Sequence, residues 1–161
     1  MNRTYLHRLA VAVSLAGALA LPGLAQARTL TLHTQMQSYR GDGAYLACYL
    51  TDANGKYQST LWVSGKKAKY YKHLRDWNLA RNRDGVPFDG VSGASVGSGE
   101  QLTVSVDVAD ALLDAGYEIR IDSAVEDKRD QPVDVRVPLT SQGAGKPVNG
   151  NGYIDSFRYD L

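Results

Sequence analysis

Hydrophobic and polar residues alternate with a period of two along most of this chain, a pattern typical of β-strands that bury one face. In residues 28–37, Leu30 and Leu32 alternate with polar residues, and residues 101–108 repeat the pattern with four aliphatic side chains. Further strands are predicted at 44–51, 58–64, 117–125, 133–139 and 153–161. Six or seven short strands of this kind favour a β-sandwich.

The period changes to that of a helix between about residues 67 and 80. Tyr70, Leu74 and Trp77 recur at i, i+4 and i+7, which places them on one face of an amphipathic helix. Leu74 and Trp77 are therefore predicted to belong to the core. Residues 82–99 contain five glycines and a proline, so the helix cannot continue and a long exposed loop is predicted.

These elements predict one mostly-β domain over residues 28–161. The expected fold is an immunoglobulin-like antiparallel β-sandwich with one inserted amphipathic helix at about 67–80 and a loop at about 82–99. Loops of this length without periodicity are more often functional than structural, so the 82–99 segment is the first place to look for a site.

The first 27 residues have the three parts of a cleavable secretory signal peptide. Arg3 and Arg8 form a short basic region, residues 9–21 are almost wholly apolar, and residues 25–27 read Ala-Gln-Ala, a small-x-small cleavage site. The apolar run is short for a membrane span, which needs about 20 residues. We therefore expect a periplasmic protein that does not span the membrane after cleavage.

The charge of the predicted mature chain is nearly balanced. The whole chain has 18 basic and 17 acidic residues, and the first 27 residues hold two of the basic ones and none of the acidic ones. Such a domain lacks the basic footprint of a nucleic-acid-binding protein. Basic residues gather at 66–83 and acidic ones at 100–134, either as solvated faces or as regions that steer an anionic partner.

Cysteine and histidine, two residue types common in metal sites and catalytic triads, are scarce in this chain. Cys48 is the single cysteine, which excludes an internal disulfide, and its apolar surroundings predict a buried, inert thiol. His33 and His73 fall on different predicted elements without ligand spacing, so neither a metal site nor a histidine-based triad is predicted.

One segment carries a more specific pattern. Residues 89–95 read Asp-x-x-Ser-Gly-Ala-Ser, with Asp89, Ser92, Gly93, Ala94 and Ser95 at the fixed positions. The pattern resembles the acceptor motif of FAD:protein FMN transferases, which attach FMN through a phosphoester to the final Ser or Thr. A phosphoryl acceptor must be a hydroxyl, and small neighbours allow another protein's active site to close around the loop. The alternative is a plain Ser/Gly-rich turn.

Longer stretches around this motif resemble a known family. Residues 61–70, 74–77 and 89–95 are similar to the periplasmic domain-of-unknown-function family 2271. That resemblance implies an association with FMN transferases and with PepSY-type membrane proteins that pass electrons across the membrane, often in iron acquisition. The chain departs from the family pattern at Val63-Ser64, which interrupts the usual Trp-Gly junction, and at Ser95, which replaces the more common Thr.

If FMN is attached at Ser95, neighbouring residues acquire expected roles. Tyr70 and Tyr71 are candidates to stack on the flavin ring, where each aromatic pair contributes about 0.5 to 1.5 kcal/mol. Lys66 and Lys67, with Lys69, are candidates to neutralise the phosphate, and the alternative for them is a solvated basic face. Asp89 is assigned to recognition by the transferase.

The leading hypothesis is a periplasmic electron-transfer flavoprotein with covalent FMN on Ser95, a redox carrier more than an enzyme. The alternative is a periplasmic binding or adaptor module without flavin, which would serve a membrane-bound reductase or a metal-uptake system. A hydrolase has the least support, because no convergent set of histidine and carboxylate residues is legible in the sequence.

Overall fold

The computed structural model describes residues 26–83, 85 and 92–161. The predicted signal peptide therefore lies outside the described residues, except for Gln26 and Ala27. The strands are β1 (Ala27–Met36), β2 (Tyr45–Thr51), β3 (Tyr57–Ser64), β4 (Ser92–Gly93), β5 (Gln101–Ala109), β6 (Glu118–Ala124), β7 (Gln131–Pro138), β8 (Val148–Asn149) and β9 (Ile154–Asp160). The helices are the 3₁₀ helices η1 (Ala68–His73) and η2 (Asp110–Leu112) and the α-helix α1 (Arg75–Arg83).

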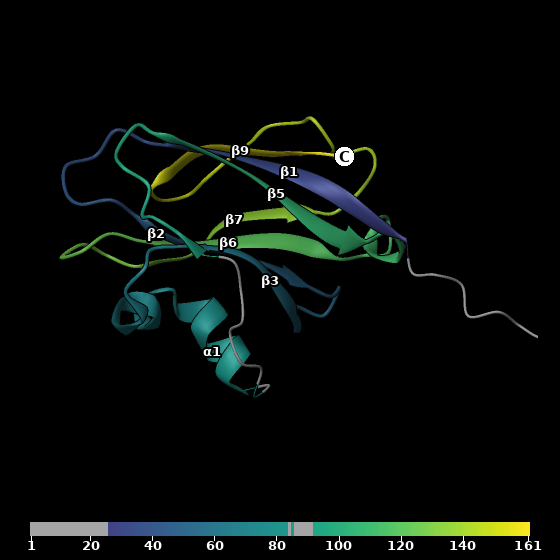
Figure 1. The fold of residues 1–161 in the computed structure, drawn as a ribbon, viewed down its shortest axis with the longest axis horizontal. Coiled ribbons are helices and arrows are strands. Elements are labelled where there is room, and N and C mark those ends of the chain that lie inside the picture. Colours follow the sequence, from purple (N-terminus) through teal and green to yellow (C-terminus); the bar gives the residue numbers. More distant parts are fainter. Residues whose placement is uncertain (1–25, 84, 86–91) are drawn as a thin grey trace, which may run out of the picture.

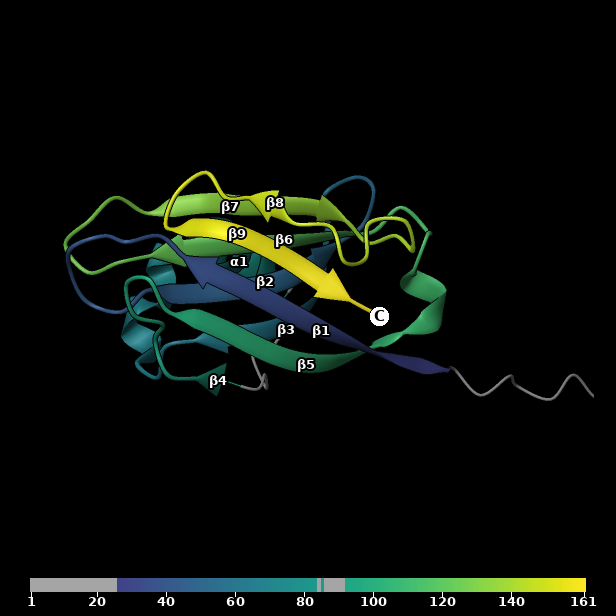
Figure 2. The ribbon, with the colours of Figure 1, turned by 90° about the horizontal axis from the view of Figure 1, so that it is seen from above.

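The strands form two stacked sheets, and a short helical layer covers the outer face of the second sheet (Figure 1). The first sheet has the order β5-β1-β9-β8 and the second the order β4-β3-β2-β6-β7. Figure 2 shows the first sheet from above, with β1 between β5 and β9. The pairs are antiparallel except for β3 with β4. The predicted β-sandwich with one inserted helical segment is confirmed.

The main core lies between the two sheets. It is built from the apolar positions of the alternating strands, for example Leu30 and Leu32 of β1 and Ile121 of β6, which are at most 2% exposed. Cys48 of β2 is buried, as predicted, and burial raises the pKa of its thiol. The thiol is therefore held in its protonated, unreactive form.

A second apolar cluster lies on the outer face of the second sheet, beneath η1 and α1. Its members are Ala47, Tyr49, Tyr57, Val63, Tyr71, Leu74, Trp77 and Ala124. This cluster explains why residues 44–50 are all aliphatic, aromatic or cysteine, because β2 is covered by the first sheet on one face and by the helical layer on the other. Leu74 and Trp77, predicted as core residues, are fully buried here.

The single helix predicted for 67–80 is wrong in its form. The segment is divided at Leu74 (φ −83°, ψ 74°) into the 3₁₀ helix η1 and the α-helix α1, and α1 runs on to Arg83. The buried carboxylate of Asp122 fixes the start of α1, since its Oδ2 accepts the Trp77 backbone N–H at 2.8 Å. The Trp77 indole Nε1–H donates to Thr60 Oγ1 of β3, also at 2.8 Å.

Candidate functional site

Backbone pairing holds residues 92–95, here called the acceptor segment, against the edge of the second sheet. Ser92 and Gly93 form β4 beside Val63 and Ser64 of β3, and the Gly65 N–H donates to the Gly93 carbonyl at 2.9 Å. The predicted loop at 82–99 is therefore anchored in its second half. Asp89, the first residue of the motif, lies outside the described residues.

Gly93 allows this close approach because it has no side chain. A Cβ at position 93 would lie 2.7 Å from Cζ2 of Trp62, on the neighbouring strand. The glycine of the motif thus has a structural reason in this fold, namely that β4 packs directly against a tryptophan ring. Because Gly93 lets β4 approach the sheet so closely, it also determines where the next two residues, Ala94 and Ser95, lie. Both are exposed.

Ser95 is flanked by a second backbone anchor. Ala44 and Val96 exchange two hydrogen bonds of 2.7 and 3.0 Å, which form an isolated antiparallel bridge. The bridge brings Gly43 beside Ser95, and a Cβ at position 43 would lie 2.7 Å from Ser95 Oγ. The Ser95 hydroxyl is therefore exposed on a fixed backbone, in space that the missing side chain of Gly43 leaves open.

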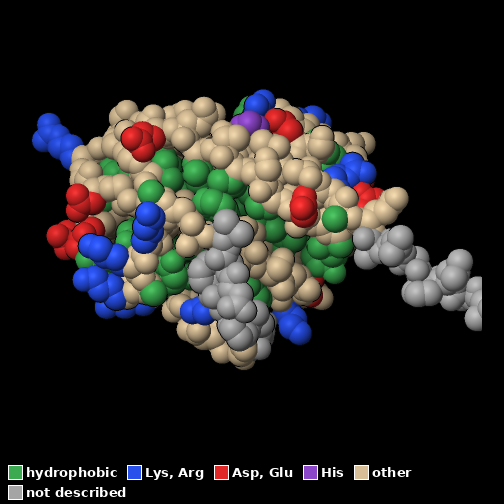
Figure 3. All heavy atoms as spheres, viewed as in Figure 1, with side chains coloured by type: hydrophobic (Ala, Val, Ile, Leu, Met, Phe, Trp, Pro, Cys, Tyr) green, Lys and Arg blue, Asp and Glu red, His purple; other side chains and the backbone are tan. Residues whose placement is uncertain are grey.

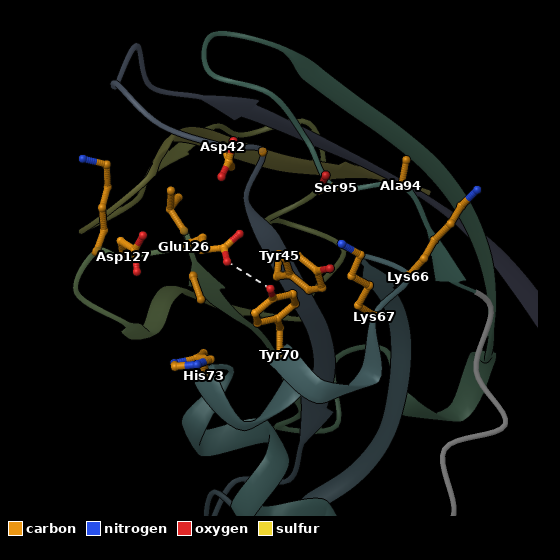
Figure 4. A pocket seen from close by; sticks show the side chains of 14 residues that line it. Asp42, Tyr45, Lys66, Lys67, Tyr70, His73, Ala94, Ser95, Glu126 and Asp127 are labelled. Carbon is orange, nitrogen blue, oxygen red and sulfur yellow. Dashed lines mark hydrogen bonds between the residues drawn. The ribbon is translucent and has the colours of Figure 1, made fainter.

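Ser95 opens onto a pocket of about 730 Å³, which is within the range of small-molecule and cofactor sites. Four segments line it: residues 42–45, the helical segment 66–73, the acceptor segment, and residues 124–128. Figure 4 shows Ser95 and His73 at opposite ends of the pocket, with Tyr45, Tyr70 and Glu126 between them. The pocket thus joins the motif to the predicted aromatic and basic residues.

The 3₁₀ geometry of η1 determines which of its side chains face the pocket. Because a 3₁₀ helix has three residues per turn, side chains three apart lie above one another. Lys67, at the N-cap, and Tyr70 and His73 of the helix form one such row, and all three line the pocket. We call Lys67, Tyr70 and His73 the pocket row.

Tyr70 is held in place within the pocket by three neighbours. Its hydroxyl donates to Glu126 Oε1 at 2.9 Å, and its ring packs edge-on against Tyr45 with centroids 5.5 Å apart (Figure 4). The Lys69 ammonium lies 4.7 Å from the ring centroid. An aromatic corner with one fixed orientation is therefore present before any ligand binds. Tyr45 belongs to this corner, although the sequence analysis did not select it.

Tyr71 does not line this pocket. It is 8% exposed in the cluster beneath α1, where its ring packs edge-on against Trp77 with centroids 5.5 Å apart. Its hydroxyl donates to the Gly65 carbonyl at 2.9 Å, and burial raises the pKa of that hydroxyl. The structure thus separates two tyrosines that are adjacent in the sequence: Tyr70 contributes to the pocket and Tyr71 to the core.

Charges of opposite sign meet in the pocket. Lys66 and Lys67 line it from the helical segment, and Glu126 and Asp127 line it from the connection between β6 and β7. Lys67 directs its ammonium toward the Ser95 end of the pocket in Figure 4, whereas Lys66 extends along the outer rim beyond Ala94. Basic and acidic side chains lie next to one another at this end of the molecule in Figure 3. The basic and acidic regions of the sequence therefore meet at one site.

A histidine that carries no local sequence signal also lines this pocket. His73 lies next to Asp130, with Nδ1 3.1 Å from Oδ1, although 57 residues separate them. Nothing in the local sequence marks this pair, because the contact depends on how η1 packs beside the β6–β7 connection. No hydrogen bond joins Ser95 to His73 among the described residues, and the two lie at opposite ends of the pocket (Figure 4). This arrangement is therefore not that of a hydrolase triad, in which the base must reach the nucleophile.

Comparison with known proteins identifies a family and no closer relative. The family model described as predicted periplasmic protein (DUF2271) matches residues 27–156, from β1 into β9. No curated protein and no solved structure matches the chain. Within the described residues, no helix combines the length and apolar character needed to cross a bilayer. The matched range contains the acceptor segment and the whole pocket, and the chain belongs to the DUF2271 family of predicted periplasmic proteins.

Proposed function

We propose that this protein is a periplasmic electron-transfer flavoprotein in which FMN is attached through a phosphoester to Ser95. The observation that carries the proposal is the convergence of separate segments on one pocket. Ser95, Lys66 and Lys67 were selected from the sequence for the phosphate of FMN and Tyr70 for its ring, and all four line the same pocket of about 730 Å³. If residues 89–95 were only a Ser/Gly-rich turn, nothing would explain why these four residues line one pocket.

The residues of the pocket fit the chemistry of FMN. Ser95 Oγ would carry the phosphate, and the ammonium groups of Lys66 and Lys67 would offset its negative charge. The corner formed by Tyr45 and Tyr70 offers an aromatic wall for the ring. Bound flavin supplies the redox chemistry, and the protein supplies attachment, orientation and electrostatics.

The proposal assigns the attachment reaction to a separate enzyme, an FAD:protein FMN transferase. A serine hydroxyl is unreactive alone, and its activation belongs to the transferase. The acceptor must then enter another active site, and the exposed Ala94 and Ser95 on an anchored segment are suited to this. Export by the N-terminal signal would bring the acceptor into the compartment where these transferases act. A PepSY-type membrane protein is the proposed electron-transfer partner.

Co-expression with an FMN transferase and intact-mass measurement test the proposal. The transferase moves FMN from FAD to the serine hydroxyl and AMP leaves, so the wild-type chain is expected to gain the mass of one FMN less one water, and Ser95→Ala is expected to gain none. Ser98→Ala is the matched control, since Ser98 is an exposed serine three residues further along the same loop. An unmodified wild type, or a Ser95→Ala variant that still gains FMN, would contradict the proposal.

A variant outside the motif tests the geometry of the acceptor. Gly43→Ala leaves residues 89–95 unchanged but places a methyl group beside Ser95 Oγ, which must then rotate away. Gly43 does not have a positive φ, so alanine is compatible with its backbone. We expect a folded protein that is flavinylated more slowly than the wild type, measured as the modified fraction over time. Equal rates would show that the transferase does not depend on this hydroxyl orientation.

The adaptor hypothesis gives a different outcome in the same experiment. A binding module without flavin would stay unmodified and colourless in the presence of an active transferase, and it would co-purify with a membrane-bound reductase or a metal-uptake protein. The charged rim of the pocket is compatible with such a partner, so the mass measurement decides between the two functions.

A further inference from the structure

His73 lies at the end of the pocket away from Ser95 (Figure 4), and it forms a hydrogen-bonded pair with Asp130. Nδ1 lies 3.1 Å from Oδ1 and 3.4 Å from Oδ2 of the carboxylate. A carboxylate accepts, so the Nδ1 of His73 donates and its proton is fixed on that nitrogen. Nε2, the other ring nitrogen, belongs to a side chain that is 43% exposed.

The position of His73 within the pocket row places the imidazole at the end of the pocket away from Ser95. The row presents a cation at Lys67, an aromatic ring at Tyr70 and an imidazole at His73, in that order away from Ser95. With a rise of about 2 Å per residue in a 3₁₀ helix, Lys67 and His73 lie about 12 Å apart along the axis. A ligand attached at Ser95 and packed on Tyr70 would therefore have its distal edge near the imidazole.

We propose that His73, oriented by Asp130, holds at Nε2 the proton that accompanies reduction of the flavin ring. This inference rests on the proposed function. Two electrons reach the ring from an external reductant, dithionite in the test below. The imidazolium of His73 gives its Nε2 proton to the reduced ring, and the neutral imidazole regains a proton from water. Histidine is suited to this exchange because its charge changes between about pH 5 and 8.

Charged and titratable groups on several elements contact His73 or share its pocket. They are Asp130, Glu126, Asp127 and Lys128 from the connection between β6 and β7, Lys67 and Tyr70 from its own row, and Asp42 and Tyr45 from the segment that leads into β2. Among the described residues, Asp130 alone forms a hydrogen bond with His73. Substitution of His73 alone keeps all the other groups and so isolates the imidazole.

The first test uses the unmodified protein and no flavin activity. Nitrogen-15 NMR of the imidazoles should show His73 with its proton on Nδ1 in the wild type and lose that preference in Asp130→Asn. Added free FMN should shift the His73 Nε2 signal. His33 is the matched control, because it lies on the outer face of the first sheet, bonded to Asp160, and should not respond. An unresponsive His73 signal would overturn the inference.

The second test uses the FMN-loaded protein. Reduction by dithionite is followed by stopped flow in wild type, His73→Gln and His33→Gln. General acids contribute large factors to proton transfer, and for this half-exposed group we expect a loss of about tenfold in His73→Gln. The pH dependence between about pH 5 and 8 should disappear with it. His33→Gln should match the wild type. An unchanged rate and pH profile in His73→Gln would overturn the inference.

The two tests fail separately from the proposed function. If Ser95 gains no FMN, the covalent flavoprotein proposal is wrong, whereas a His73 signal that responds to free FMN would still support a proton-holding imidazole at a non-covalent flavin site. If Ser95 is flavinylated and neither test moves His73, the pair with Asp130 is structural and the inference alone is wrong.

Discussion

Two rows of side chains lie on different faces of the helical segment formed by η1 and α1. The pocket row lines the cavity that Ser95 borders, whereas Tyr71, Leu74 and Trp77, here called the core row, belong to the cluster on the second sheet. Both rows have a spacing of three residues, and each contains a tyrosine. The two rows differ in the surroundings of that tyrosine.

The core row is closed to solvent and its polar atoms are paired within the protein. Its exposed fractions are 8%, 0% and 0%, with the Tyr71 hydroxyl on a backbone carbonyl and the Trp77 indole on Thr60. The pocket row keeps an ammonium, a phenol and an imidazole at a cavity wall. We expect stability to depend on the core row and, under the proposed function, ligand binding to depend on the pocket row, so variants of each row can separate the two.

The largest expected effect is that of Trp77→Ala. Removal of a fully buried indole leaves a cavity beneath α1 and strips Thr60 Oγ1 of its donor, at a cost of about 3 to 5 kcal/mol in the free energy of unfolding. Urea denaturation followed by circular dichroism measures this loss. A loss below about 1 kcal/mol would mean that α1 packs independently of the core row.

Asp122 is expected to come next, because it ties the start of α1 to the sheet. Its carboxylate accepts from the backbone N–H groups of Trp77 and Val133 and from the Tyr49 hydroxyl. Asp122→Ala leaves these buried donors unpaired, at about 1 to 3 kcal/mol each before relaxation, so we expect a total loss of about 3 kcal/mol. An unchanged urea midpoint would show that water replaces the carboxylate.

The same residue predicts a pH dependence. Burial raises the pKa of Asp122, and the hydrogen bonds from Trp77, Val133 and Tyr49 only partly oppose the rise. The folded state therefore binds this proton more tightly than the unfolded state. Protonation of Asp122 therefore adds to the free energy of unfolding. This gain is fully present below the unfolded pKa, near 4, and is lost as the pH rises through the folded pKa. Relative to Asp122→Ala, the wild type should lose stability over that window. A constant difference between the two would contradict the assignment.

The smallest effects come from the two adjacent tyrosines, and they are the sharpest comparison. Tyr71→Phe removes a buried hydrogen bond to Gly65 and should cost about 1 kcal/mol of stability. Tyr70→Phe removes a hydrogen bond to the exposed Glu126 and should cost less than about 0.5 kcal/mol of stability. Without that bond, the ring at position 70 is no longer held in one orientation. Fluorescence quenching of bound FMN should therefore change in Tyr70→Phe and not in Tyr71→Phe. A change in Tyr71→Phe and none in Tyr70→Phe would contradict the assignment of Tyr70 to the pocket and Tyr71 to the core.

Much of the fold follows from local patterns in the sequence. Period-two alternation located the long strands β1 and β5, and a further strand was predicted at 44–51, where β2 lies. The break at Leu74 was not predictable, because the spacing of Tyr70, Leu74 and Trp77 suits one α-helix. What divides the segment is a tertiary contact, since the start of α1 is held by Asp122, 45 residues away from Trp77.

The candidate site was predicted only in part for the same reason. Ser95, Lys66, Lys67 and Tyr70 carry local signals, a motif or a spacing, and the structure brings them to one pocket. Tyr45, Glu126 and the pair of His73 with Asp130 carry none, because they are brought there by strand pairing and by the connection between β6 and β7. Tyr71, a candidate for stacking on the flavin, lies in the cluster beneath α1, since sequence alone cannot tell which of two adjacent rings faces the core.

The most direct test of the central claim is to locate the flavin on the chain. Trypsin releases residues 84–120 of the co-expressed protein as one peptide, since no Lys or Arg lies between Arg83 and Arg120. This peptide contains Ser92, Ser95 and Ser98, and fragmentation mass spectrometry distinguishes them. We predict that the whole mass of FMN resides on Ser95. FMN on another residue, or an unmodified peptide in the presence of an active transferase, would contradict it.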